Sequence, residues 1–200
     1  MRKIFILSLS FYLLLCACRS GKSNESADST STATRDTAKK NYLPVKDYLI
    51  AEIATIDSFP YKLMRYRISQ GKTDSGIITT AEFNRIAAEF LLPDLDSSRF
   101  EKNFEENSFV DQTTNLVSFT YSTKDTGNGL KSVDVLLSPG TGTNKLYSIY
   151  MEAISENADS TQISKLSWKA GRSFSILHLI KPKKGAETTS QTIVVWDSRD

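Results

Sequence analysis

The chain has 200 residues, with 25 Lys or Arg, 23 Asp or Glu, a single His and two Cys. Two of the basic residues lie in a leader described below, so the rest of the chain is formally neutral, which argues against a nucleic-acid-binding protein because such a protein needs a basic surface. The single His excludes metal sites with two His ligands.

The first residues have the pattern of a bacterial export signal. Arg2 and Lys3 form a positive start, and roughly twelve uncharged apolar residues follow, fewer than the roughly twenty that a membrane span needs. Leu15, Ala17 and Cys18 resemble the lipobox of bacterial lipoproteins. This resemblance implies that Cys18 is the lipidated first residue of the mature protein, anchored by acyl chains. An ordinary secretory signal cut after Ala17 is the alternative.

Residues 18–41 are predicted to be the lipidated Cys followed by a disordered tether. The segment is rich in Ser, Thr, Ala, Asp and Lys and has no aromatic residue before Tyr42, so it cannot bury enough surface to fold. Arg19, rather than an acid, follows Cys18. By resemblance to Gram-negative and Bacteroidota sorting signals, this implies an outer-membrane protein that faces the periplasm. Residues 1–17 are then the signal peptide, and residues 42–200 form a single domain.

Three helices are predicted in the first half of the domain, over residues 44–60, 79–93 and 98–104. Thr79 and Glu82 have the spacing of a capping box at the start of the second helix. Apolar residues recur at helical spacing in the first two helices: Val45, Tyr48, Leu49, Ile53 and Ile56, then Phe83, Ile86, Ala87, Phe90 and Leu91. These are amphipathic helices with one buried face.

Residues 61–68, between the first two helices, alternate in the manner of a strand and lead to a turn at Gln70-Gly71. Arg65 and Arg67 share one face of this strand, which is therefore cationic. From Leu116 onward the apolar residues recur at every second position in six further runs. The runs are Val117, Phe119, Tyr121; Val133, Val135, Leu137; Tyr147, Ile149, Met151, Ala153; Leu166, Trp168; Phe174, Ile176, His178, Ile180; and Thr192, Val194, Trp196.

This order of elements predicts an α+β fold. Two to three N-terminal helices pack on one face of a curved antiparallel sheet, whose strands form a C-terminal β-meander. Residues 166–174 and 194–197 resemble the C-terminal pattern of small uncharacterised outer-membrane lipoproteins of the Bacteroidota. The resemblance covers about the last third of the chain. It implies no activity and carries over no functional residue.

His178 would have to serve any Ser-His-acid triad. Alternation places it on one face with Phe174, Ile176 and Ile180, toward the core or the helices, and no Gly-x-Ser-x-Gly elbow accompanies it. A partly buried structural histidine is therefore expected. The alternative is an envelope hydrolase with His178 as base, which requires His178 to lie in a cleft beside a serine or an acid. No catalytic residue, metal site or cofactor is assigned.

Tyr147, Tyr150, Trp168 and Trp196 form the candidate binding surface, provided that they are exposed; core packing is the alternative for these aromatic residues. The sheet face that the helices leave uncovered is expected to carry a polar and aromatic set: Ser148, Tyr150, Glu152, Ser164, Ser175 and Lys181. A further reading encloses an apolar ligand between sheet and helices, because these five phenylalanines supply much aromatic surface: Phe83, Phe90, Phe100, Phe104 and Phe109.

These observations favour an outer-membrane-anchored periplasmic lipoprotein that acts as a non-enzymatic binding or envelope-assembly module. Its expected partners are the membrane, through the N-terminal lipid, and an envelope protein or peptidoglycan, with no nucleic acid. An apolar-ligand-binding lipoprotein and a hydrolase that uses His178 are the alternatives.

Overall fold

The computed structural model describes residues 42–125, 127, 129–140 and 144–197. The predicted signal peptide, Cys18 and the tether at residues 18–41 lie outside this part of the chain. The described residues form three α-helices, two 3₁₀-helices and nine strands. In chain order these are α1 (Val45–Ser58), β1 (Leu63–Ser69), β2 (Lys72–Ile78), α2 (Thr80–Ala87), η1 (Ala88–Phe90), η2 (Pro93–Leu95), α3 (Ser97–Asn103), β3 (Phe104–Asp111), β4 (Leu116–Thr123), β5 (Gly129–Ser138), β6 (Lys145–Glu156), β7 (Ser160–Lys169), β8 (Ser173–Pro182) and β9 (Thr188–Val195).

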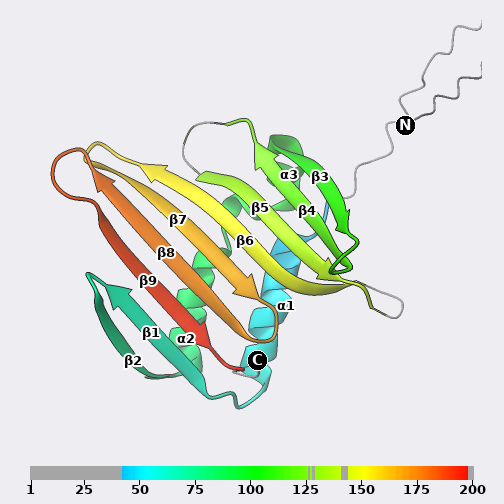
Figure 1. Cartoon of the computed structure of the whole chain (residues 1–200), viewed down its shortest axis with the longest axis horizontal. Coiled ribbons are helices and arrows are strands. Elements are labelled where there is room, and N and C mark those ends of the chain that lie inside the picture. Colours follow the sequence, from blue (N-terminus) through cyan, green and yellow to red (C-terminus); the bar gives the residue numbers. More distant parts are fainter. Residues whose placement is uncertain (1–41, 126, 128, 141–143, 198–200) are drawn as a thin grey trace, which may run out of the picture. The chain divides into compact units, whose positions relative to one another are not determined.

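The nine strands form one antiparallel sheet in the order β2-β1-β9-β8-β7-β6-β5-β4-β3. Strands β3 to β9 are a continuous meander, and the β1–β2 hairpin joins its far edge through β9 (Figure 1). Gln70 and Gly71 both have positive φ, of 50° and 74°, as a two-residue type I′ hairpin turn requires. The turn predicted at these two residues therefore connects β1 to a strand that the sequence pattern did not indicate.

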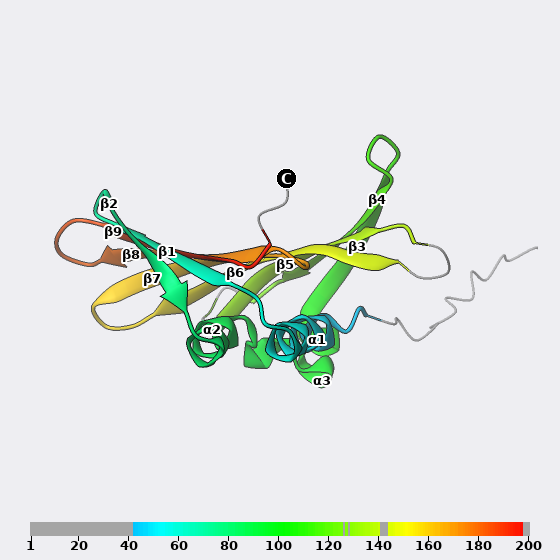
Figure 2. The ribbon, with the colours of Figure 1, turned by 90° about the horizontal axis from the view of Figure 1, so that it is seen from below.

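All the helices lie on one face of the twisted sheet (Figure 2). The core is between the two layers and is rich in aromatic rings, which pack at the edge-to-face and tilted angles that such rings favour. Phe83 of α2 and Phe90 of η1 contact Trp168 and Phe174, with ring centroids 5.1 to 6.3 Å apart. None of the helices among the described residues has the length and apolar character needed to cross a membrane.

A second aromatic cluster holds the segment that precedes α1. The ring of Tyr42 packs against Phe100 and Tyr121, and its hydroxyl donates to the Phe104 carbonyl at 2.7 Å. The Leu43 amide donates to the Tyr121 hydroxyl at 3.1 Å. Burial raises the pKa of Tyr121 because ionisation would place a charge away from water. The domain is thus fastened at its first described residues to β3, β4 and α3.

The coarse fold prediction is confirmed: an antiparallel sheet carries helices on one face, and the six predicted runs correspond to β4–β9. The finer prediction of N-terminal helices holds only in part, because a full β1–β2 hairpin lies between α1 and α2 and the sheet dominates the domain. Strands β2 and β3 are the two edges of the sheet. Most of their side chains are exposed, so their sequences lack the alternation that marked the interior strands.

Candidate functional site

The four aromatic residues of the candidate binding surface do not form one surface. Trp168 is 0% exposed and Trp196 is also buried, because both lie in the core beneath α2 and contact Phe83. For these two the core alternative is the correct one. Tyr150 is half-buried on the uncovered sheet face, in register with Asp134 and Ser167. Tyr147 is 44% exposed at an irregularity between β5 and β6.

The phenylalanines do not enclose an apolar pocket. Phe83, Phe90, Phe100 and Phe104 are buried in the core, where they pack against each other or against Trp168, Phe174 and Tyr121, whereas Phe109 is exposed. Their surface is therefore used in joining the helices to the sheet. A set of hydrogen-bonded polar side chains lies elsewhere, around His178.

His178 lies on β8, on the face that the helices cover, as its alternation with Phe174 and Ile176 predicted. The side chain is 25% exposed, and its Nε2 lies 3.1 Å from Oε2 of Glu89 on η1. On the other side of the ring, Nδ1 lies 3.0 Å from the Ser164 hydroxyl and 3.1 Å from Nε2 of Gln162, both on β7. The ring thus joins the sheet to the helical layer.

The carboxylate of Glu89 can only accept, so it pairs with an N–H at Nε2 of the ring, while Nδ1 is within hydrogen-bond distance of the polar groups on β7. The Gln162 amide also donates to the Ser164 hydroxyl at 3.1 Å. The polar set therefore consists of Glu89, His178, Gln162 and Ser164. Each of these side chains has a hydrogen-bond partner, which is the usual condition for half-buried polar groups.

A pocket of about 410 Å³ opens beside this polar set. Its floor is a row of residues that stand opposite one another across four strands: Leu130, Ala153, Ser164 and His178. Glu89 of η1 and the loop that leads to η2 form the wall above this row, and Leu166 and Ile154 add apolar surface. A concave, largely apolar site with a few convergent polar groups is typical of small-ligand pockets.

Asp94 on η2 closes the other end of the pocket. Its Oδ2 atom accepts from the Leu130 amide at 2.9 Å. Gly129, beside Leu130, has φ of +110°, and a Cβ there would lie 2.8 Å from the same oxygen. Glycine is therefore required for Asp94 to approach β5. Asp94 thus contacts a strand that lies 36 residues further along the chain.

The order of contacts from Glu89 through His178 to Ser164 is that of an acid, a base and a hydroxyl. It meets the geometric requirement of the hydrolase alternative, which needed His178 in a cleft beside a serine or an acid. Ser164, however, lies within the ladders of both β6 and β8, and a hydrolase also needs donors aimed at a developing oxyanion. The contacts on their own describe a satisfied polar network that faces a pocket.

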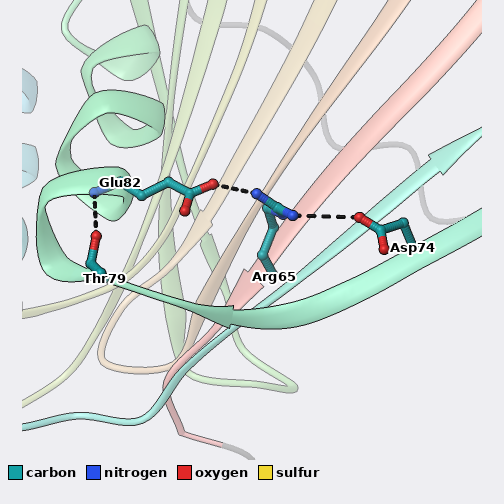
Figure 3. Close-up of polar contacts among 4 residues, drawn as sticks. All are labelled: Arg65, Asp74, Thr79 and Glu82. Atoms are coloured by element: carbon teal, nitrogen blue, oxygen red, sulfur yellow. Dashed lines mark hydrogen bonds and ion pairs between the residues drawn. The ribbon is translucent and has the colours of Figure 1, made fainter.

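The remaining candidates have other roles. The cationic face predicted for β1 turns toward α2, where Arg65 bonds the Glu82 carboxylate and lies 3.4 Å from Asp74 of β2 (Figure 3). Ser164 was expected on the uncovered face and lies on the opposite one, whereas Glu152 lies on the uncovered face near Lys165, at 3.8 Å. No group of three or more His, Cys, Asp or Glu side chains suited to a metal ion occurs among the described residues.

Sequence reasoning missed Ser164, Gln162 and Glu89 as neighbours of His178. A signal for the first two was present: a tight turn at Ala170-Gly171 pairs Trp168 with Phe174, and continuing that register by twos brings Ser164 opposite His178. Nothing local indicated Glu89, because its position depends on how η1 crosses the sheet.

Comparisons with protein-family models, with curated proteins and with solved structures gave no match for this chain. Functional conclusions therefore depend on the residues of the pocket and of the exposed surfaces.

Proposed function

We propose that the protein is a non-enzymatic, lipid-anchored lipoprotein of the outer membrane, facing the periplasm, and that it binds a small ligand in the pocket beside His178. The observation that carries the proposal is the composition of this pocket. An apolar floor of Leu130 and Ala153 continues into the polar set of Ser164 and His178 along one cross-strand row. A pocket lining that changes from apolar to polar along its length suits a ligand with an apolar body and polar ends.

The anchor is the second part of the proposal. Cys18 holds the lipid, and the chain between it and Tyr42 is the tether. The C-terminal resemblance to small Bacteroidota lipoproteins supports the same placement.

Native mass spectrometry of the full chain, purified from its own envelope, tests ligand binding. We expect a co-purified small molecule that is lost in Ala153→Phe, which fills the pocket floor. Ser167→Phe, on the uncovered face of the neighbouring strand, is the control and should keep the ligand. A wild-type chain that carries no small molecule, and that no fraction of envelope metabolites stabilises against heat, contradicts the proposal.

His178→Ala separates binding from hydrolysis. If the chain is a binding protein, this substitution weakens ligand binding and lowers the melting temperature, because Glu89 and Ser164 lose the side chain that both of them contact. In a hydrolase the same change abolishes turnover of ester or amide substrates and leaves stability nearly intact. Turnover by the wild-type chain that His178→Ala removes would therefore overturn the non-enzymatic assignment.

The uncovered sheet face supports a second candidate function, the binding of an envelope protein. Ile77 is 68% exposed there, and Tyr66 and Met64 continue the apolar surface on β1. Exposed apolar patches of this kind mark protein contact sites. In-cell crosslinking followed by purification from outer-membrane fractions should recover a stoichiometric protein partner, whose yield falls in Tyr66→Ser. Recovery of peptidoglycan alone counts against a protein partner.

A further inference from the structure

The pocket beside His178 has a carboxylate at each end of its floor. Glu89 meets His178 on β8, and Asp94 meets Leu130 on β5. Strands β6 and β7 lie between these contacts, and neighbouring strands are about 4.8 Å apart, so the two ends of the floor are separated by roughly 14 Å. His178 lies in register with Ser164 of β7, and its Nδ1 is 3.0 Å from the Ser164 hydroxyl.

The floor between the carboxylates is formed by small and apolar groups. Ala153 and Leu130 belong to the row itself, and Leu166 lies beside it. Ser164 is occupied by His178 and Gln162. An alkyl chain laid along the row would contact carbon atoms for most of its length, and burial of each methylene contributes about 0.8 kcal/mol.

Among the described residues that line the pocket, no Lys or Arg pairs with the two carboxylates. Lys131, which follows Leu130 in the sequence, is turned to the β4–β5 loop, where its Nζ donates to the carbonyls of Asp125 and Gly127. In the part of the chain that the structure describes, each carboxylate makes its hydrogen bond through one oxygen, Oε2 of Glu89 and Oδ2 of Asp94, and the second oxygen can accept from a ligand.

We propose that the pocket binds a linear aliphatic diamine or polyamine, with one ammonium group on Glu89, the other on Asp94 and the alkyl chain on the floor between them. This inference rests on the proposed ligand-binding function and names its ligand class. Two charge-assisted hydrogen bonds at a fixed separation select for ligand length as well as for charge. A monoamine can pair with only one of the two carboxylates, and a diacid is repelled by both carboxylates.

Isothermal titration calorimetry of the full chain with four probes of one chain length tests the inference: octanediamine, octylamine, octanediol and octanedioate. We expect the diamine to bind most tightly, the monoamine more weakly and the dioate not at all. Glu89→Gln and Asp94→Asn keep an acceptor for His178 and for the Leu130 amide while they remove the charge. Each should weaken the diamine about fivefold, as expected for partly exposed ion pairs.

The double variant should bind octanediamine no better than octanediol, and Glu101→Gln on α3, outside the pocket, should leave all affinities unchanged. Diamine binding that is indifferent to both carboxylates, or no tighter than diol binding, overturns the inference. The proposed ligand-binding function still stands after that result if another co-purified molecule is present in the wild-type chain and lost in Ala153→Phe. If no molecule of any class binds, the function and the inference fail together.

Discussion

At the scale of single residues, the Glu52 carboxylate joins α1 to the turn between β7 and β8. Its Oε2 atom accepts from the Gly171 amide at 2.7 Å and from the indole of Trp168 at 3.3 Å. Glu52→Ala leaves both donors without this acceptor, and Trp168 is fully buried. We expect the free energy of unfolding to fall by about 2 kcal/mol, measured by urea denaturation. Glu52→Gln keeps an acceptor oxygen and should lose less than half as much; equal losses would contradict this account.

Asp111 makes the stability of the domain sensitive to acid. Hydrogen bonds from Thr113 and Thr114 lower its pKa from 3.8 to about 2. The unfolded state therefore binds the proton more readily, so this contribution is present above pH 3.8 and is lost as the pH falls toward 2. Asp111→Asn should flatten the plot of unfolding free energy against pH in this window. Thr113→Val should flatten it partly, and an unchanged slope in Asp111→Asn would refute the assignment.

At the scale of elements, helix α2 is held to the sheet at its N-terminus. The Thr79 hydroxyl accepts from the Glu82 amide at 3.2 Å, which is one half of the predicted capping box. The Glu82 side chain bonds Arg65 of β1 (Figure 3). Glu82, the acidic residue of the predicted capping box, thus makes a tertiary contact that connects α2 to the preceding β1–β2 hairpin.

A double-mutant cycle measures this contact between α2 and β1. Arg65→Met and Glu82→Gln should each destabilise the domain, and the double variant should be less destabilised than the sum. We expect a coupling energy of about 1 kcal/mol, since the arginine is mostly buried and the glutamate partly exposed. Urea denaturation of the four proteins gives this value. Strict additivity would mean that the pair does not hold α2 in place.

The elements also show what local sequence can predict. Strands β4–β9 were predictable because each interior strand places alternate residues in the core. Strand β2 was not, because Lys72, Thr73, Asp74 and Ser75 are all exposed and its place is set by the Gln70-Gly71 turn and by β1. For the site, alternation predicted the face of His178, but its partner Glu89 depends on the packing of η1 over the sheet, which no local pattern encodes.

At the scale of the whole molecule, β9 completes the sheet by pairing with both β8 and β1. Thr192 pairs with Arg67 and Ile176 in these two ladders, and proline is poorly tolerated inside a sheet. We expect Thr192→Pro to remove the protection of β1 and β2 amides in hydrogen exchange and to lower the melting temperature strongly. Thr73→Pro on the edge strand β2 is the matched control and should have a much smaller effect. Comparable losses of amide protection and of melting temperature in the two variants would show that pairing through β9 is not what holds β1 and β2 in the sheet.

The position of β9 also sets when the domain can finish folding. The β1–β2 hairpin is synthesised early, but β9, which pairs with the other edge of β1, is made after all the other strands of the meander. During synthesis, the open edge of β1 is free to pair with another chain. The order of the strands thus creates a delay between the synthesis of the β1–β2 hairpin and its pairing with β9. A chaperone that binds the hairpin until β9 emerges would protect the nascent protein from aggregation.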